Sequence, residues 1–163
     1  MHKFSFVKNY KINWSNKNEE DDRMATANIE VTFLCPVEKI WDVVTDLSHY
    51  EWRSDISKIE VVNDKKFIEY TKDGFQTQFY VTEKETYKIW EFHMENENMK
   101  GTWSGRFYGQ GDKTTLDFTE NVTAKKIFLK PFVGAYLKKQ QKQYFIDLKK
   151  ELQCQEAGKT QLF

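Results

Sequence analysis

Apolar and polar residues alternate over residues 25–35, where the patterned part of the chain begins. This two-residue period predicts a β-strand with one face in water. Pro36 ends the strand and suits the first position of a helix, because it has no N–H to leave unpaired. Apolar residues recur at i, i+3, i+4 and i+7 from Val37 to Val44, which predicts a short helix. Ser48 and Glu51 then have the spacing of a capping box, so a second short helix is expected.

Six more strands are expected after the helix pair. The breaks at 63–64, 73–74 and 109–112 contain asparagine, aspartate or glycine, which tolerate left-handed backbone and favour hairpin turns. The strands are expected at Ile56–Val62, Phe67–Lys72, Phe75–Glu83, Tyr87–Glu95, Met99–Tyr108 and Thr114–Thr123.

A long helix is expected from Pro131 to about Gln153, with an apolar stripe on one side and lysines opposite. The order therefore predicts an α+β fold, in which a curved seven-stranded antiparallel sheet wraps around the C-terminal helix. Such a sheet twists and curls, and one helix is too narrow to fill its concave face. A gap is expected between helix and sheet, with the short helix pair closing one end.

The first part of the chain differs from the rest. Residues 15–23, SNKNEEDDR, are polar and charged, which is typical of a linker. We therefore expect an N-terminal extension and acidic linker at 1–23, one domain at 24–155 and a short tail at 156–163. Within the extension, alternate positions from Phe4 to Trp14 are strand-like.

Charge and composition exclude several classes of protein. Basic and acidic residues number 25 each, so no long-range field is available to attract nucleic acid. No stretch is apolar enough for a signal peptide or a membrane span, and a cytoplasmic protein is expected. Cys35 and Cys154 lack disulfide or zinc spacing, and His93 is expected on the outer face of its strand. The glycines match no nucleotide-binding motif, so neither a metal nor a cofactor is expected.

Large rings dominate one face of the expected sheet, since aromatic residues make up 16% of the chain. Composition leaves open whether they close into a solid core or line a pocket. The candidate ligand-binding residues on strands, the helix connection and the long helix are Trp52, Tyr70, Phe79, Trp90, Phe92, Trp103, Phe107, Phe118 and Val133.

The chain resembles the START-related polyketide cyclase and lipid-transfer superfamily, whose fold is called the helix-grip. The resemblance covers about residues 25–153 and is carried by Val31, Pro36, Val37, Ile40, Trp41, Val44, Asp46, Tyr50, Trp52, Ile59, Glu60 and Val61, then by 105–107, 114–120 and 129–152. It implies a cavity for a hydrophobic small molecule between the long helix and the sheet. Members of this family have many functions, so the resemblance specifies the fold better than the activity.

Three polar residues are expected on the apolar faces of the last strand and the long helix. Glu120 keeps the register of Leu116 and Phe118, and an inward carboxylate there would have a raised pKa and would suit a general acid or a ligand hydrogen bond. A solvated place at the rim, or pairing with a lysine, is the alternative. Gln140 and Tyr144 would present an amide and a phenol to a ligand or satisfy neighbouring groups.

Three functions remain after these exclusions. The first is binding or transport of a lipid, isoprenoid or aromatic polyketide, and it is favoured because no paired acid and base is evident. The second is a cyclase or dehydratase that uses Glu120 with Tyr144 or Tyr70. The third is an interaction module. A lysine strip on the long helix allows weak contact with a membrane surface, or is only a solvated face. The ligand and the oligomeric state stay open.

Overall fold

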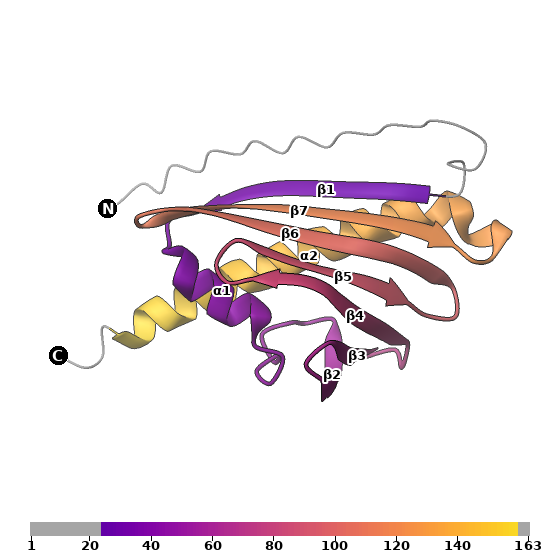
Figure 1. Cartoon of the computed structure of the whole chain (residues 1–163), viewed down its shortest axis with the longest axis horizontal. Coiled ribbons are helices and arrows are strands. Elements are labelled where there is room, and N and C mark those ends of the chain that lie inside the picture. The colour runs from indigo at the N-terminus through magenta and orange to yellow at the C-terminus, as the bar shows by residue number, and fades with distance from the viewer. Residues whose placement is uncertain (1–23, 160–163) are drawn as a thin grey trace.

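The computed structural model describes residues 24–159, with side-chain surroundings to residue 153. One seven-stranded antiparallel sheet has the order β1-β7-β6-β5-β4-β3-β2 (Figure 1). The strands are β1 (Met24–Phe33), β2 (Ile56–Asn63), β3 (Lys66–Thr71), β4 (Gln76–Glu85), β5 (Ile89–Glu95), β6 (Met99–Gln110) and β7 (Lys113–Ala124). The expected α+β architecture is confirmed. The expected N-terminal extension, 1–23, and residues 160–163 of the expected tail lie outside the described residues.

From β2 to β7 each strand pairs with the next, and β1 closes the order by pairing with β7. Gly74 and Gly111 sit in the β3–β4 and β6–β7 turns with φ angles of +83° and +59°. Glycine adopts this left-handed backbone without the steric cost that a Cβ would bring, so these turns are tight. The expected meander is therefore present, with turn chemistry at two of the expected breaks.

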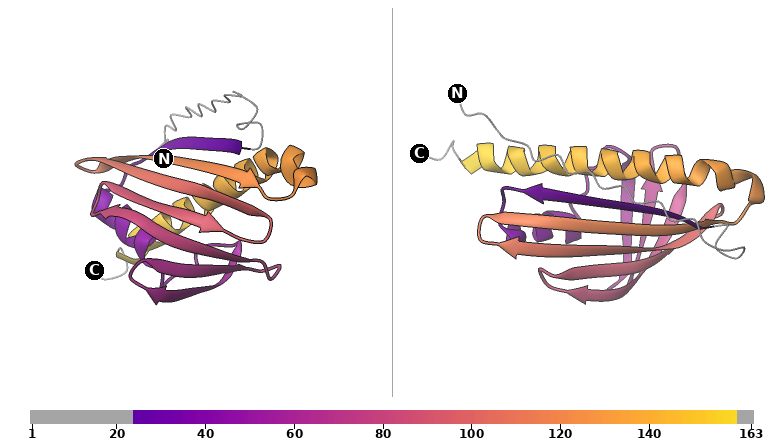
Figure 2. Two further views of the ribbon diagram at one scale, coloured as in Figure 1. Left: turned by 45° about the vertical axis from the view of Figure 1, so that its right-hand side comes forward. Right: turned by 90° about the horizontal axis from the view of Figure 1, so that it is seen from above.

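Helix α2 (Lys130–Lys159) runs along the concave side of the sheet, after the short 3-10 turn η2 (Ile127–Leu129) (Figure 2). The helix is longer than expected, because it continues past Gln153. Its apolar stripe is buried against the sheet and consists of Val133, Leu137, Phe145, Leu148 and Leu152. This stripe at helical spacing fixes which side of α2 faces the sheet.

Helix α1 (Val37–Thr45) closes one end of the concave face, near the β6–β7 turn (Figure 1). The Trp41 ring packs edge-on against Phe107 of β6, with 4.9 Å between the ring centroids. Gly109 permits this approach, since a Cβ there would lie 2.8 Å from the Val37 side chain. One helix, instead of the expected pair, thus closes this end of the concave face.

The expected second helix is wrong, because residues 46–55 form a connection of turns. Asp46 accepts hydrogen bonds from the Ser48 N–H at 2.9 Å and from Ser48 Oγ at 2.5 Å. Hydrogen bonds from Ser48 and His49 lower the pKa of Asp46 to about 2. The Ser48 side chain is therefore held by a residue before it, whereas a capping box would direct it to the N–H of Glu51.

The connection 46–55 is tied to α2 by a buried carboxylate. Asp147 Oδ2 accepts hydrogen bonds from the Ser54 N–H at 2.8 Å and from Ser54 Oγ at 2.7 Å, while Gln143 donates to Asp147 Oδ1 at 2.9 Å. Only 6% of Asp147 is exposed, and these bonds satisfy the buried charge. A segment without regular structure is thereby held against the concave side.

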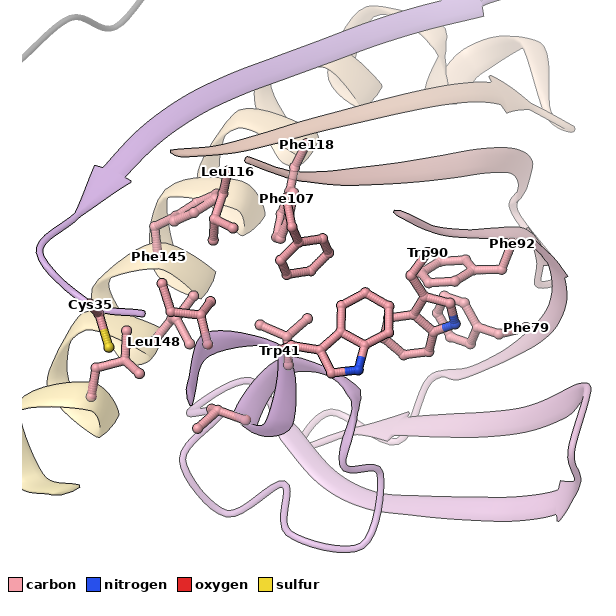
Figure 3. Close-up of a cluster of buried hydrophobic side chains, with 14 of the residues drawn as sticks. Cys35, Trp41, Phe79, Trp90, Phe92, Phe107, Leu116, Phe118, Phe145 and Leu148 are labelled. Atoms are coloured by element: carbon pink, nitrogen blue, oxygen red, sulfur yellow. The ribbon is translucent and has the colours of Figure 1, made fainter. Parts of the chain in front are cut away.

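The hydrophobic core is concentrated at the α1 end (Figure 3). Core residues that fill this end without bordering the cavity described below are Cys35, Ile40, Trp41, Phe107, Leu116 and Leu148. Leu116 and Leu148 are fully buried, from β7 and α2 respectively. A second, smaller cluster joins β1 and β7 to the first turns of α2 and contains Ala27, Val122, Ala124, Val133 and Leu137.

Candidate functional site

A cavity of about 780 Å³ lies between α2, the connection 46–55 and the inner face of the sheet. Cavities of this volume are typical of sites for small molecules. Five neighbouring strands each contribute at least one ring to its wall, and Trp90 adds a second ring from β5. The other rings, from β3 to β7, are Phe67, Phe79, Phe92, Trp103 and Phe118.

The rings pack on one another along the sheet. Phe67 stacks on Phe79 with centroids 4.8 Å apart, and Phe92 stacks on Trp103 with centroids 4.7 Å apart. Trp103 lies over Gly105, where a Cβ would come within 2.3 Å of the indole. The rings therefore form one continuous wall, which meets α2 where Phe118 packs against Phe145 with ring centroids 5.2 Å apart.

Five cavity-lining residues, Arg53, Asp55, Glu69, Glu120 and Tyr144, form what we term the polar cluster. The Arg53 guanidinium donates to Glu69 Oε1 at 2.6 Å and to both carboxylate oxygens of Asp55 at 2.9 and 3.3 Å. It also lies over the Tyr144 ring, with 5.3 Å from Cζ to the ring centroid. The connection 46–55, β3, β7 and α2 each supply part of the cluster, so the complete fold is needed to assemble it.

Burial changes the acidity of this cluster. It raises the pKa of Glu120 to about 7, and the nearby Glu69 charge adds to the rise while Arg53 opposes it. Burial also raises the pKa of Tyr144. Burial acts to lower the pKa of Arg53, but the carboxylates of Glu69 and Asp55 outweigh it and hold the guanidinium charged. Near neutral pH the Arg53 guanidinium is therefore charged and the Tyr144 phenol is protonated. The pH is then close to the pKa of the Glu120 carboxyl.

The Glu120 carboxyl and the Tyr144 hydroxyl accept or donate no hydrogen bond within the described part of the chain. Both residues border the cavity. Polar groups in an apolar space are costly without a partner. These two groups, together with the Trp90 Nε1, which is buried and has no hydrogen-bond partner among the described residues, are therefore placed to bond a guest molecule.

The structure brings most of the sequence-derived candidates together around the cavity. Those that line it are Trp52, Phe79, Trp90, Phe92, Trp103, Phe118, Glu120, Val133, Gln140 and Tyr144. Trp52 packs edge-on against Tyr144 with ring centroids 5.2 Å apart. Gln140 donates to the Tyr136 hydroxyl at 2.6 Å, so its amide is partly satisfied by a neighbour one turn away.

Two candidates lie elsewhere. Tyr70 projects from the other face of β3, where its hydroxyl approaches Glu60 and its ring lies beneath the Lys58 ammonium group. This position removes it from the proposed proton transfer with Glu120. Phe107 is buried in the core against Trp41, away from the cavity.

Phe67, Glu69 and Arg53 were not among the candidate ligand-binding residues predicted from the sequence. One signal was available, because Phe67, Glu69 and Thr71 share a two-residue period and all three line the cavity. The pairing of Arg53 with Glu69 has no local signal. It depends on the path of the connection 46–55.

Other site chemistries find little support in residues 24–159. No group of three or more histidine, cysteine, aspartate or glutamate side chains is arranged to hold a metal ion within these residues. His93 is exposed on the outer face of β5. None of the helices in the described part combines the length and apolar character needed to traverse a bilayer.

Comparison with known proteins adds a family and a fold. The profile of the family described as polyketide cyclase / dehydrase and lipid transport matches residues 24–153. No curated protein matches the chain.

Three solved structures with low sequence identity are similar in fold. A START superfamily protein from Mycobacterium smegmatis has a TM-score of 0.69 and 15% identity, over 80% of this chain and 97% of that one. The Zhui aromatase/cyclase from Streptomyces sp. R1128 has a TM-score of 0.71 and 10% identity, over 78% and 93%. A conserved protein from Geobacillus kaustophilus has a TM-score of 0.68 and 14% identity, over 77% and 93%.

Proposed function

The chain belongs to the polyketide cyclase / dehydrase and lipid transport family, and from this premise we propose that it binds or transports a small hydrophobic molecule between α2 and the sheet. The observation that carries the proposal is the cavity of about 780 Å³ with its continuous aromatic wall. Affinity comes from apolar ligand surface that leaves water.

The polar cluster narrows the class of ligand. The Tyr144 hydroxyl and the protonated form of Glu120 are hydrogen-bond donors, so they suit a ligand with an acceptor oxygen such as a ketone, quinone or hydroxyl. Arg53 is already paired with Asp55 and Glu69. With two carboxylates around one guanidinium, a further anion is repelled. We therefore propose a neutral polyketide, isoprenoid or sterol-like ligand and disfavour a fatty-acid anion.

A specific observation favours a second candidate, a cyclase or dehydratase. The pKa of Glu120, about 7, suits a general acid or base near neutral pH. In this version Glu120 moves a proton to or from a bound ketone, and Tyr144 donates to the carbonyl oxygen. The ligand class is the same in both candidates.

Binding is tested by native mass spectrometry of the purified full chain and by thermal unfolding with a ligand panel. The panel pairs neutral ketones, quinones and sterols with fatty acids of matched length. We expect neutral members to raise the melting temperature and fatty acids to have little effect. Stabilisation by none of the neutral ligands, with no passenger in the mass spectrum, would contradict the proposal.

Glu120→Gln separates carrier from enzyme. A carrier keeps its affinity within a few fold, because glutamine still donates a hydrogen bond. An enzyme that uses this carboxyl loses a factor on the order of a hundred or more in rate on a ketide-like substrate. Unchanged turnover in the variant would remove Glu120 from any catalytic role.

A further inference from the structure

Exposed apolar side chains surround the mouth of the cavity. The β3–β4 turn, the β5–β6 turn and the start of α2 all lie at the end of the molecule opposite α1 (Figures 1 and 2). Phe75, Phe132 and Tyr136 line the cavity there and are nonetheless exposed. Ile127 and Phe128 precede α2 and are 70% and 69% exposed. We term these five residues the mouth patch.

Folding does not account for the mouth patch. The η2 turn, Ile127–Leu129, has no buried residue. Phe132 occupies the first turn of α2 and is 68% exposed, while its neighbour Val133 is buried. Clustered apolar side chains of this kind in water mark an interaction surface.

Charge at this end is strongly one-sided, although the chain as a whole has no net charge. Residues 125–139, KKIFLKPFVGAYLKK, contain five lysines and no acidic residue. Lys72 and Lys100 add two lysines at the mouth, against Asp73, Glu95 and Glu97. Glu95 is already paired with Lys125 at 2.7 Å. Seven lysines against three acidic residues therefore make the surroundings of the mouth patch positive on balance.

We propose that the mouth patch docks on an anionic bilayer, with Ile127, Phe128 and Phe132 in the interfacial region and the surrounding lysines against lipid phosphates. Apolar side chains enter the headgroup boundary and nearby lysines are attracted to an anionic leaflet. The cavity mouth then faces the membrane. A hydrophobic guest passes between bilayer and cavity without crossing water, a step that rests on the proposed function.

The same charges disfavour a second copy as the occupant. A symmetric dimer through the mouth patch would place two lysine-rich surfaces opposite each other, and such like-charge contacts are unfavourable. An anionic bilayer supplies both the complementary charge and the apolar medium. It also matches the position of the mouth patch around the cavity opening.

The test is co-flotation of the full chain with vesicles of phosphatidylcholine, alone or mixed with phosphatidylglycerol. We expect binding to the mixed vesicles, little to phosphatidylcholine alone, and a decrease when salt is raised. The double variant Phe128→Ser with Phe132→Ser should bind at least about tenfold more weakly. Lys126→Gln with Lys130→Gln should weaken binding by roughly a factor of five for each lysine.

Matched controls lie at the other end of the molecule. Leu34→Ser removes an apolar side chain that is 73% exposed, and Lys113→Gln removes an exposed charge from the first residue of β7. Neither control should change flotation, and all variants should keep the wild-type melting temperature. Ligand binding is measured separately, without vesicles. A negative flotation result therefore contradicts only the docking proposal, and a negative ligand-binding result contradicts the proposed function.

Several outcomes would overturn docking. They are no flotation with either vesicle, flotation unaffected by the serine pair, and a concentration-dependent dimer that the serine pair abolishes. Binding to an acidic protein without binding to vesicles would likewise assign the mouth patch to another partner.

Discussion

Inside the cavity, the Arg53 guanidinium donates a hydrogen bond to Glu69 Oε1 at 2.6 Å. The bond joins the connection 46–55 to β3, at a place where burial raises the pKa of Glu69 and the Arg53 charge opposes that rise. Since Asp55 holds the other edge of the guanidinium, Arg53 organises the polar cluster.

The first prediction concerns this pair. Arg53→Met leaves Glu69 and Asp55 facing each other without their cation, and we expect a loss of about 2 to 4 kcal/mol in the free energy of unfolding. Glu69→Gln should cost less, because Arg53 retains Asp55. Urea unfolding measures both, and the exposed pair Lys58–Glu60 is the control. A loss no larger than that of the control would refute the role of Arg53.

The second prediction concerns pH. Glu120 has a pKa of about 7 in the folded protein against 4.5 for the free side chain. The folded state therefore holds this proton more tightly, so the carboxyl lowers stability as pH rises from 4.5 to about 7, by up to about 3 kcal/mol above that range. Glu120→Gln should match wild type below pH 4.5 and be more stable above pH 7.

Unfolding free energies measured across this pH range test the sign. Glu30→Gln, on the exposed side of β1, serves as the control for loss of a carboxylate. If the difference between Glu120→Gln and wild type is the same at both ends of the range, the carboxyl is not desolvated as described.

The third prediction concerns the wall. In Gly105→Ala the new methyl group meets the Trp103 indole, and relief requires the ring to tilt into the cavity. Overpacking of this kind costs about 1 to 3 kcal/mol, and the tilted ring should also weaken ligand binding. Thr102→Ala, on the exposed face of β6, is the matched control. Intact stability and affinity in Gly105→Ala would mean that the ring has freedom the structure does not indicate.

The fourth prediction concerns the tie between the connection 46–55 and α2. Asp147→Ala removes the acceptor for the Ser54 N–H and Oγ, and we expect about 2 to 3 kcal/mol of destabilisation. Ser54→Ala removes one of the two bonds and should cost less. Hydrogen exchange at the Ser54 amide should accelerate in Asp147→Ala, and unchanged protection there would contradict this role.

Regular periodicity carried most of the fold prediction. The two-residue alternation of β7 placed Glu120 on the same face as Leu116 and Phe118, and that is the face that lines the cavity. The apolar stripe of α2 was predicted in the same way, because apolar residues spaced three or four apart lie on one side of a helix. These patterns are local in the sequence, so they can be recognised without knowledge of the tertiary structure.

The errors arose where local signals compete. Ser48 satisfied a capping-box pattern, but Asp46 is nearer in the chain and takes its hydroxyl, so no second helix forms. In β3 both faces carry an apolar residue, and the candidate Tyr70 lies on the outer face because Phe67, which pairs with Phe79 of β4, occupies the inner one. Composition left solid core and pocket equally open. The distinction depends on the tertiary packing of the rings, because rings of one core cluster both pack against α1 and line the cavity.

The central claim is that the space between α2 and the sheet admits a hydrophobic guest. The most direct measurement is titration of a neutral aromatic ketone by calorimetry into wild type and two tryptophan variants. Met94→Trp places an indole inside the cavity, whereas Tyr70→Trp places one on the outer face of the sheet. We predict one bound ketone per chain for wild type and Tyr70→Trp, and loss of binding for Met94→Trp. Equal binding by both variants would contradict the account.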